Sequence, residues 1–588
     1  YKAVLDHLPA SVSTVDQLAT AGGTPSGYHS SSESRTIWVQ VTTDNFNDLF
    51  GTDATLLQSG DAYFWTGSLT LPEHVKGLYF DMNVSPVTPA GSAGPPAALL
   101  VGTQGPGNGA GPTANDPQEV AALYNFPLTG QAVATGTLAL LEPGLGNAPP
   151  VLGGPTVAKL LDSYRIGIGL TGGAVVRGVQ AGGTNAGDPP ERALDIGVAT
   201  AINPGSPLVL YAGSGTAYGA QSEPFTAYQD AFWDRTHAAA VVSSSYRLTA
   251  AQASPDSPFM FAARELFIDA ALHNISVFQS SGDGGSSYQV ANGLTNVAAT
   301  RASPYSVIVG GTSITEVSVA PADSTLKKAY LEPALAGSPT TLWQLAAGGL
   351  SQLPTAGSAD WFAEAVWNRY NITSLPAGIV PGLFATGYLS NQSGNGGVDG
   401  TQRTPWFQSA LLPLAPPTTT DGTDITGRGL PDVSALASGN MYYNVPTPDL
   451  SSTKGDGGTS AATPLWASLG LQLNAIFADQ HLPNLGYMTD LLYIAAAIAP
   501  GAFNDVTIGN NVSSYLGGAS GQPYLAYNSQ TELLEAIDPT GYGYYAGPGF
   551  DLASGIGSPN GLLLARALTA IAHHQVSFAD HHDVLVAD

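Results

Sequence analysis

The chain contains no cysteine among its 588 residues. This absence excludes disulfide bonds, cysteine-ligated zinc and thiol nucleophiles, so any nucleophile must be an oxygen or a nitrogen. Basic residues are also scarce, because 18 Lys and Arg stand against 44 Asp and Glu and give a formal net charge of −26. A chain this acidic has few positive charges to neutralise phosphates or anionic headgroups. Nucleic acid and membrane surfaces are therefore not expected partners.

Long apolar runs are missing as well. The longest, such as residues 491–499, fall well short of the roughly 20 residues that cross a bilayer. The chain opens at Tyr1 without a basic and then apolar leader, and we expect any secretion signal to have been removed. Five Asn-x-Ser/Thr sequons give weak support for an extracellular location. They are Asn83, Asn274, Asn371, Asn391 and Asn511.

Charged residues of either sign make up only 11% of the chain, whereas hydrophobic residues make up 43%. This composition is typical of a folded protein rather than a disordered one. With every carboxylate protonated, the 18 Lys and Arg and the 10 His would carry at most 28 positive charges. Acid therefore produces little self-repulsion, and the composition favours a protein that stays folded at low pH.

The chain divides into two predicted units joined by a linker. Residues 1–85 mix short strand-like and helix-like segments and predict a small α+β unit. Residues 86–116 are dominated by Pro, Gly, Ala and Thr, which bury too little apolar surface to fold, and they predict a linker. In residues 117–588 apolar strand-like runs alternate with helical ones, which predicts an α/β fold with a parallel sheet covered on both faces. Within this unit, residues 316–400 break the alternation and predict a long surface insertion.

The strongest local motif is a glycine-rich turn that places Ser460 at the start of a helix. It reads Gly457-Gly458-Thr459-Ser460-Ala461-Ala462-Thr463-Pro464. A helix N-terminus offers free N–H groups and positive dipole character, which stabilise a nucleophilic oxygen and help to hold an oxyanion. Taken alone, an ordinary helix cap is the more frequent explanation of such a serine.

Two carboxylates, Glu191 and Asp195, follow Pro189 and Pro190 at a spacing of four residues. This spacing places them on one face of a helix, where like charges repel unless one is protonated or each has a partner. Paired carboxylates with separated pKa values serve as acid and base in many enzymes. A solvated first helical turn is the alternative.

Two further carboxylates follow predicted strands. Asp283 comes after the apolar run 275–278, at the carboxyl edge of a parallel sheet, where such folds build their sites. The dipeptide Asp283-Gly284 is also an ordinary turn sequence. Glu142 ends another apolar strand, directly before Pro143.

A last pair of carboxylates, Asp505 and Asp551, lies near the C-terminus among glycines. Carboxylates together with exposed backbone carbonyls suit Ca²⁺, which takes 6–8 oxygen ligands. The Gly547-Pro548-Gly549 sequence would otherwise be a simple loop.

In their order along the chain, over roughly residues 117–570, these motifs resemble those of the sedolisin family of serine-carboxyl peptidases, specifically its kumamolisin-like members with an N-terminal pro-region. The resemblance implies a subtilisin-like fold in which Ser460 is the nucleophile and Glu191 its general base. Asp195 would orient Glu191, and Asp283 would stabilise the oxyanion.

The resemblance implies further roles. Glu142 would hydrogen-bond to the catalytic carboxylates, and residues 1–85 would be the later portion of a pro-domain that acts as an intramolecular inhibitor or chaperone, with the activation cleavage in the linker. Many members carry a Trp where this chain has Tyr246. A Ca²⁺ ion would be held by the side chains of Asp505 and Asp551 and the main-chain oxygens of Val506, Gly547 and Gly549.

The function expected from the sequence is therefore an acid-acting endopeptidase that hydrolyses protein or peptide substrates through an acyl-enzyme on Ser460. A glutamate base suits this role, because an imidazole of pKa ~6.5 would be locked as a cation in acid. A catalytically silent, secreted binding or surface protein on a peptidase scaffold is the alternative from another class. A neutral subtilisin is disfavoured, because no His lies in a His-Gly-Thr context. The C-terminal histidines predict a solvated tail more than a metal site: His573, His574, His581 and His582.

Overall fold

The structure of the chain is a computed structural model. It describes residues 1–16, 28–59, 62–81, 84–86, 113–129, 135–143, 155–171, 173, 175–179, 188–214, 224–248, 254–287, 297, 299–316, 331–339, 362–373, 388–411, 426–439, 441–517, 524–528, 533–539 and 543–586.

A mostly parallel sheet forms the centre of the larger unit. Its strands stand in the order β8–β9–β7–β10–β11–β12, β18 pairs with β12, and β13 pairs with the later part of β12. Every described pairing in this sheet is parallel except that of β12 with β13. The strands are β7 (Leu138–Leu141), β8 (Val176–Val179), β9 (Leu208–Tyr211), β10 (Val241–Ser244), β11 (Ser276–Ser280), β12 (Val307–Glu316), β13 (Phe362–Val366) and β18 (Val433–Leu436).

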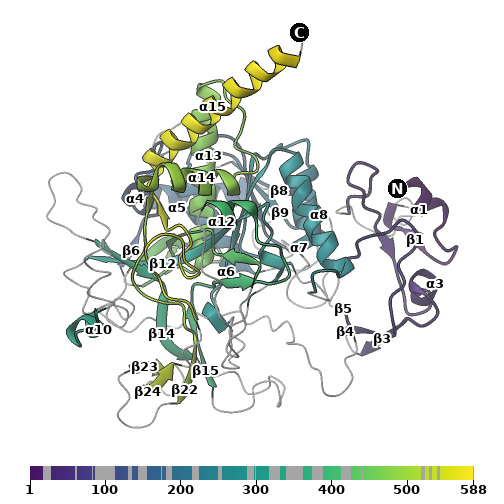
Figure 1. Cartoon of the computed structure of the whole chain (residues 1–588), viewed down its shortest axis with the longest axis horizontal. Helices are drawn as coiled ribbons and strands as arrows, with labels where there is room; N and C mark the ends of the chain where they lie inside the picture. The colour runs from purple at the N-terminus through teal and green to yellow at the C-terminus, as the bar shows by residue number, and fades with distance from the viewer. Residues whose placement is uncertain are drawn as a thin grey trace.

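Helices cover both faces of this sheet (Figure 1). Alternate residues of β7 point to opposite faces, so Leu138 and Leu140 join one core while Ala139 and Leu141 join the other. The first core packs against α4, α6, α13, α14 and α15, and the second against α7 and α8. The predicted α/β class is therefore confirmed. These helices are α4 (Pro117–Leu123), α6 (Pro189–Ile202), α7 (Pro224–Trp233), α8 (Pro258–Leu272), α13 (Thr459–Asp479), α14 (Thr489–Ile498) and α15 (Gly561–Val586), and α5 (Pro155–Gly167) lies beside α6.

Local sequence explains where the two central helices begin. Asp188 caps α6 by accepting a hydrogen bond from the Glu191 N–H at 3.4 Å, and two prolines occupy the first helical positions. Gly458 caps α13 with a φ of +107°, a conformation that favours glycine. A Cβ on Gly458 would also lie 2.7 Å from Oδ2 of Asp283, so the close approach of these two residues requires glycine.

The N-terminal residues form a small unit of their own, beside α8 in Figure 1. Its core gathers aromatic side chains, among them Phe46, Phe50 and Trp65, and it is completed by Phe259 of α8. The unit contains a two-stranded and a three-stranded sheet. Its elements are α1 (Lys2–Asp6), β1 (Ser13–Thr14), β2 (Val39–Gln40), α3 (Phe46–Phe50), β3 (Thr55–Ser59), β4 (Ala62–Thr66) and β5 (Val84–Pro86).

Most of the predicted linker, residues 87–112, lies outside the described residues. Residues 113–115 form β6, which pairs with β19. The range of the predicted insertion includes β13 of the central sheet and two strands of a small closed barrel, β14 and β15. The remaining elements are α10 (Glu332–Leu335), β14 (Asn368–Thr373), β15 (Tyr388–Ser393), β16 (Gly397–Asp399), α12 (Trp406–Ala410), β17 (Arg428–Leu430), β19 (Met441–Pro446), β20 (Thr453–Asp456), β21 (Phe503–Asn504), β22 (Ser514–Gly517), β23 (Tyr524–Asn528), β24 (Leu533–Pro539) and β25 (Ser558–Pro559).

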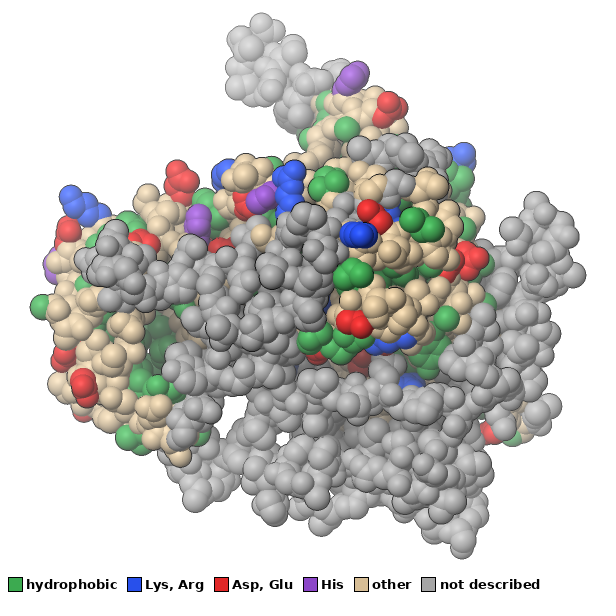
Figure 2. Space-filling view, turned by 180° about the vertical axis from the view of Figure 1, so that it is seen from behind, with side chains coloured by type: hydrophobic (Ala, Val, Ile, Leu, Met, Phe, Trp, Pro, Cys, Tyr) green, Lys and Arg blue, Asp and Glu red, His purple; other side chains and the backbone are tan. Residues whose placement is uncertain are grey.

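The described surface carries few charges. Figure 2 shows Lys, Arg, Asp and Glu side chains scattered among larger uncharged areas of the face that it presents. Helix α15 projects beyond the body of the molecule at its C-terminal end (Figure 1). Within the described ranges, no helix combines the length and the apolar character needed to cross a membrane.

Candidate active site

Ser460 occupies the second position of α13, and its side chain is partly exposed. The preceding residue, Thr459, is buried and ties the turn to the end of β11. Its backbone N–H donates to Oδ1 of Asp283 at 2.9 Å, and its hydroxyl donates to the same oxygen at 2.8 Å. The Thr459 hydroxyl oxygen also accepts from the Gly282 N–H at 3.1 Å. The predicted nucleophile and the predicted oxyanion residue are thus brought together by Thr459.

Asp195 lies fully buried on α6, which packs along α13. The hydroxyl of Ser245, directly after β10, lies 3.0 Å from Oδ2 and 3.1 Å from Oδ1 of Asp195. The same hydroxyl lies 3.5 Å from the carbonyl oxygen of Ser460. That carbonyl lacks its usual helical partner because Pro464, four residues on, has no N–H. Ser245 therefore connects α6 to the first turn of α13.

Glu191 lies one helical turn before Asp195, with a partly exposed side chain. Burial raises the pKa of Glu191 to about 8, and the charges of Asp188 and Asp283 add to this increase. Hydrogen bonds from the hydroxyls of Ser460 and Ser245 act in the opposite direction. The predicted base and nucleophile therefore lie within hydrogen-bonding reach of each other.

Glu142 follows β7 and is 2% exposed. Neither of its carboxyl oxygens forms a well-shaped hydrogen bond with a described residue, and the same holds for the buried hydroxyl of Tyr246. The Tyr246 hydroxyl nevertheless lies close enough to Glu142 to lower its pKa. Burial outweighs this effect and raises the pKa of Glu142 well above its ordinary value, while Arg192 opposes the increase.

These carboxyl groups act on one another. Burial raises the pKa of Asp195 well above its ordinary value, and the charges of Glu142 and Glu191 raise it further. Charges of like sign in a poorly solvated place repel strongly, so the groups lose their protons in coupled steps. The cluster holds protons at a pH at which isolated carboxyls would have lost them.

Asp283 is partly exposed, and its two carboxyl oxygens have different surroundings. Oδ1 accepts both Thr459 donors, whereas Oδ2 lies against the Cα side of Gly458. Burial raises the pKa of Asp283, and the Thr459 hydrogen bonds and the positive charge of Arg301 oppose this. A protonated Asp283 would carry its proton on Oδ2, the oxygen that Thr459 leaves free.

The predicted calcium ligands lie in one loop region. The Gly549 N–H donates to Oδ2 of Asp505 at 2.8 Å, and the Gly547 N–H donates to Oδ2 of Asp551 at 3.0 Å. The hydroxyl of Ser554 lies 3.1 Å from each oxygen of Asp551. The structure therefore places both carboxylates against the glycine loop predicted to contribute carbonyls.

The surroundings of the two carboxylates bear on whether this loop could hold a cation. Burial raises the pKa of Asp551 to about 7 and raises that of Asp505 as well. Neither carboxylate forms an ion pair with a described Lys or Arg. The Val506 carbonyl lies beside Asp551, because the Ser554 hydroxyl also donates to it at 3.2 Å. No group of three or more His, Asp or Glu side chains suited to a metal occurs in the described part of the chain.

Three residues at this site escaped the sequence analysis: Ser245, Thr459 and Arg301. Ser245 lies directly after β10, and Arg301 lies shortly before β12. Polar residues are common in such segments and show no distinctive spacing. Thr459 was within the motif, but its bond to Asp283 joins residues far apart in the chain. A polar residue directly after a buried strand is the signal that could have found Ser245.

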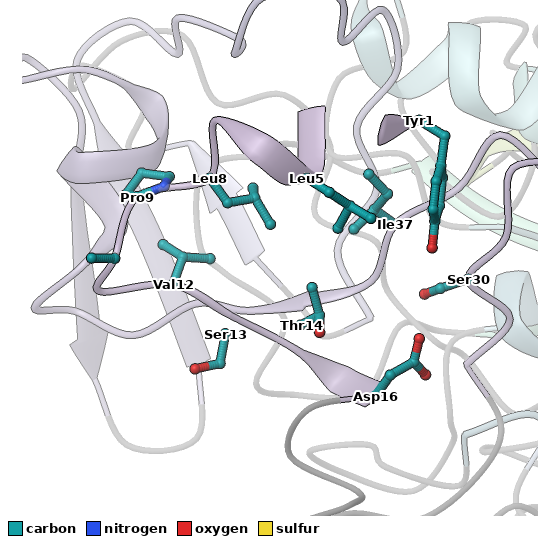
Figure 3. A pocket seen from close by; sticks show the side chains of 11 residues that line it. Tyr1, Leu5, Leu8, Pro9, Val12, Ser13, Thr14, Asp16, Ser30 and Ile37 are labelled. Carbon is teal, nitrogen blue, oxygen red and sulfur yellow. The ribbon is translucent and has the colours of Figure 1, made fainter. Parts of the chain in front are cut away.

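A cavity of about 450 Å³ lies elsewhere, in the N-terminal unit. Figure 3 shows apolar side chains such as Leu5, Leu8 and Ile37 on one side of it and the carboxyl of Asp16 on the other. All of its lining residues fall within residues 1–37. It therefore contains none of the predicted catalytic or calcium-binding residues.

No family model matches the chain. Kumamolisin from Bacillus sp. (strain MN-32) is 29% identical over 468 residues, which are 78% of this chain and 64% of kumamolisin, so the chain spans less than two thirds of that relative. Physarolisin from Physarum polycephalum is 37% identical over 106 residues, which are 18% of this chain and 17% of physarolisin.

Among solved structures, the chain is similar to the Pseudomonas sedolisin (serine-carboxyl proteinase) complexed with two molecules of pseudo-iodotyrostatin. The TM-score is 0.52 at 21% identity, over 78% of this chain and 99% of the sedolisin chain. This likeness concerns the fold, in which a parallel sheet lies between two helical layers. Because the similarity to kumamolisin extends over most of the chain and the fold is that of sedolisin, the chain is homologous to the serine-carboxyl peptidases of the sedolisin family.

Proposed function

We propose that the chain is an acid-acting endopeptidase that cleaves protein or peptide substrates through an acyl-enzyme on Ser460. One observation carries the proposal. The Ser460 hydroxyl lies within hydrogen-bonding reach of Glu191, in a group of carboxyls that includes the buried Asp195 and adjoins Asp283. A serine nucleophile, a carboxylate as general base and a carboxylic acid as hydrogen-bond donor are together sufficient for acyl transfer without histidine.

Catalysis begins with the Ser460 oxygen. Its Oγ attacks the peptide carbonyl carbon while its proton moves to the Glu191 carboxylate. Glu191 then delivers that proton to the leaving amine, the C–N bond breaks, and the acyl group remains on Ser460. Water attacks the ester in a second round, its proton passes to Glu191, and the Ser460 hydroxyl is restored as the acid product leaves.

Asp195 acts through Glu191 and is a positioning residue. Its protonated carboxyl would share a hydrogen bond with Glu191, while Ser245 holds Asp195 from the other side at 3.0 Å. Glu142, directly after β7, raises the pKa of Asp195 and so favours its protonated form, while burial raises the pKa of Glu142 itself. These neighbours keep the base aimed at Ser460 without adding negative charge in acid.

Asp283 would stabilise the oxyanion. Because Thr459 donates twice to Oδ1, a proton on Oδ2 is free to be donated to the tetrahedral intermediate. A carboxyl serves as a donor only while protonated, so a raised pKa suits Asp283 to this role. The positive end of α13 adds to the stabilisation.

Acid conditions reconcile the high pKa of Glu191 with its role as a base. Part of the increase to about 8 comes from the charges of Asp188 and Asp283. Once those two carboxyls are protonated, that part disappears, and hydrogen bonds from Ser460 and Ser245 favour the remaining charge on Glu191. A single carboxylate in the group is sufficient for proton transfer.

A Ca²⁺ ion would be held by the carboxylates of Asp505 and Asp551 and by main-chain oxygens of Val506, Gly547 and Gly549. Its chemistry there would be structural, since a divalent cation offsets the desolvated charges of two buried aspartates. The buried Asp551, without a described cationic partner, supports this assignment.

The N-terminal unit, residues 1–85, would serve as an intramolecular inhibitor or chaperone, joined by the cleavable linker 86–116. Its contacts with the larger unit support this role. Arg35 pairs with Glu265, at 3.0 Å, and with Asp269 of α8. Several aromatic contacts reinforce the attachment, among them Tyr79 stacked on Phe225 and Trp65 stacked on Phe259.

An extracellular location is proposed on composition alone, and two of the five sequons, Asn391 and Asn511, are buried.

Replacement of Ser460 by Ala tests the proposed function. Hydrolysis of a denatured protein at about pH 4, where an ordinary carboxyl is half ionised, should fall to background. The control is Ser163→Ala on the exposed face of α5, which should leave hydrolysis unchanged. Near-full activity of Ser460→Ala would refute the assignment, and an inactive but well-folded parent chain would support the silent-scaffold alternative.

A further inference from the structure

The buried guanidinium of Arg301 lies between the ends of two neighbouring strands. It is 8% exposed and belongs to a short 3-10 turn, Ala299–Arg301, before β12. Nη1 donates to the carbonyl and hydroxyl oxygens of Ser280, the last residue of β11. Nη2 donates to the carbonyl of Ser245, just after β10, at 3.4 Å. Arg301 therefore bridges the ends of β10 and β11.

The charge of Arg301 has no counter-ion among the described residues. Its acceptors are two carbonyls and one hydroxyl, and its Nε–H, also buried, has no hydrogen-bond partner there. Asp283 lies close enough for Arg301 to lower its pKa, but the two form no ion pair. A buried cation without a counter-ion is costly unless a ligand supplies the opposite charge.

The location of this cation is next to the proposed chemistry. The Ser245 hydroxyl reaches toward the Ser460 carbonyl, and Asp283 comes three residues after Ser280. A substrate carbonyl held between Ser460 and Asp283 would therefore lie near the ends of β10 and β11. The side chain of that same substrate residue, P1, would then extend toward the strand ends that Arg301 bridges.

We propose that Arg301 makes the enzyme select an acidic side chain, Glu or Asp, at P1. This inference rests on the proposed function, since it concerns the same site. The carboxylate of P1 would accept from the free Nε–H and from the guanidinium edge, an arrangement that gives charge-assisted hydrogen bonds. A glutamine at P1 has the same shape but lacks the charge, so it would bind less well.

Ionisation of the substrate gives the proposal a distinctive pH dependence. A free Glu side chain has a pKa of about 4.3, so it is mostly neutral at about pH 3 and mostly ionised at about pH 5.5. Guanidinium groups do not titrate in this range. Among the described residues, the titratable groups that face Arg301 are the carboxyl of Asp283 and the phenol of Tyr228. The phenol stays neutral in acid, so only Asp283 changes its charge there.

The experiment compares two amidated, N-acetylated peptides that differ only in Glu or Gln at P1, with Glu placed at P3 in a third peptide. The ratio of kcat/KM for Glu over Gln at P1 should rise by about tenfold or more from pH ~3 to pH ~5.5, as expected for hydrogen bonds to a charged group. The P3 peptide should show no such rise. Arg301→Gln should reduce the ratio toward one, Arg301→Lys should keep part of it, and the exposed Arg403→Gln should leave it unchanged.

A ratio that stays flat with pH in the unmodified enzyme, or that survives Arg301→Gln, would overturn the proposal. If Arg301→Gln fails to fold, the pH dependence of the unmodified enzyme still decides. Ser460-dependent cleavage of the Gln peptide without any Glu preference would reject only the role of Arg301. Absence of Ser460-dependent cleavage of every peptide would reject the proposed function itself.

Discussion

Oδ1 of Asp283 accepts hydrogen bonds from both the N–H and the hydroxyl of Thr459, the residue directly before Ser460. These two hydrogen bonds occupy Oδ1, so Oδ2 is the oxygen that could donate to a substrate in the proposed mechanism. It also couples the end of β11 to the first turn of α13, so that a change at Asp283 is felt next to the nucleophile.

Replacing Asp283 by Ala should lower kcat by about 10²–10³-fold, the usual cost of losing an oxyanion donor. Asp283→Asn should retain more activity, because an amide can donate and can still accept from Thr459. Since an amide does not ionise in this range, Asp283→Asn should also extend activity to higher pH. Steady-state kinetics across pH measures both effects, and an Asn variant with an unshifted alkaline limb would contradict the donor role.

Replacing Asp188 by Asn should lower the pH at which Glu191 loses its proton, over the range in which Asp188 itself is ionised. In that range the charge of Asp188 raises the pKa of Glu191, so removing the charge lowers that pKa and extends activity toward acid. The shift should be about half a pH unit or more, as for a nearby like charge. Asn preserves the helix cap. The exposed Asp479→Asn is the control for net charge, and equal shifts in both variants would argue against a local effect.

If the proposed site holds Ca²⁺, its removal by a chelator should destabilise the chain more at pH 7 than at pH 4. Without the ion, burial raises the pKa of Asp551 to about 7, above its unfolded value, so lowering the pH through 7 protonates Asp551 and stabilises the folded state. A bound cation requires the ionised carboxylate, so its affinity falls over the same range. Thermal melts with calcium and with a chelator measure the difference at each pH.

The matched variant for this test is Asp551→Asn. It should melt at a temperature that no longer responds to calcium at pH 7, whereas the exposed Asp479→Asn should respond like the parent chain. A calcium response that persists unchanged in Asp551→Asn would show that the ion binds elsewhere.

Replacing Arg35 by Ala should weaken the hold of the N-terminal unit on α8. Burial raises the pKa of Asp269, so on acidification this carboxyl becomes neutral at a higher pH than an ordinary Asp. Once neutral, it no longer attracts Arg35. After cleavage between about residues 90 and 118, the N-terminal fragment should therefore separate in acid, and at a higher pH in Arg35→Ala. Size-exclusion chromatography across pH measures the release.

The control for that experiment is Lys76→Ala, which removes an exposed positive charge from the same unit. It should release the fragment at the same pH as the parent chain. If Arg35→Ala behaves like Lys76→Ala, the ion pairs do not govern the attachment.

Much of the site was accessible from local pattern. The spacing of Glu191 and Asp195 required only a helix to place them on one face, and the glycine-rich turn predicted Ser460 at a helix start. Both features depend on neighbours in the sequence, which is why they could be predicted. The alternation of apolar runs likewise predicted the parallel sheet that β7 and its neighbours form.

The link from Ser245 to Asp195 and the placement of Arg301 could not be predicted in this way. Ser245 is one of three consecutive serines, and nothing in their order tells which one turns toward α6. Arg301 looks like any surface arginine in the sequence, yet its contacts with Ser280 and Ser245 bury it.

The sequence by itself determined the absence of thiol chemistry and the scarcity of Lys and Arg. It also determined where the helices begin and which segments form strands. Tertiary structure alone decided that the ends of α6, α13, β10 and β11 meet, that Glu191 is desolvated enough to raise its pKa to about 8, and that Arg301 lacks a counter-ion among the described residues. The physical reason is that periodicity and capping need only nearby residues, whereas desolvation and charge pairing depend on which distant segments the packed core brings together.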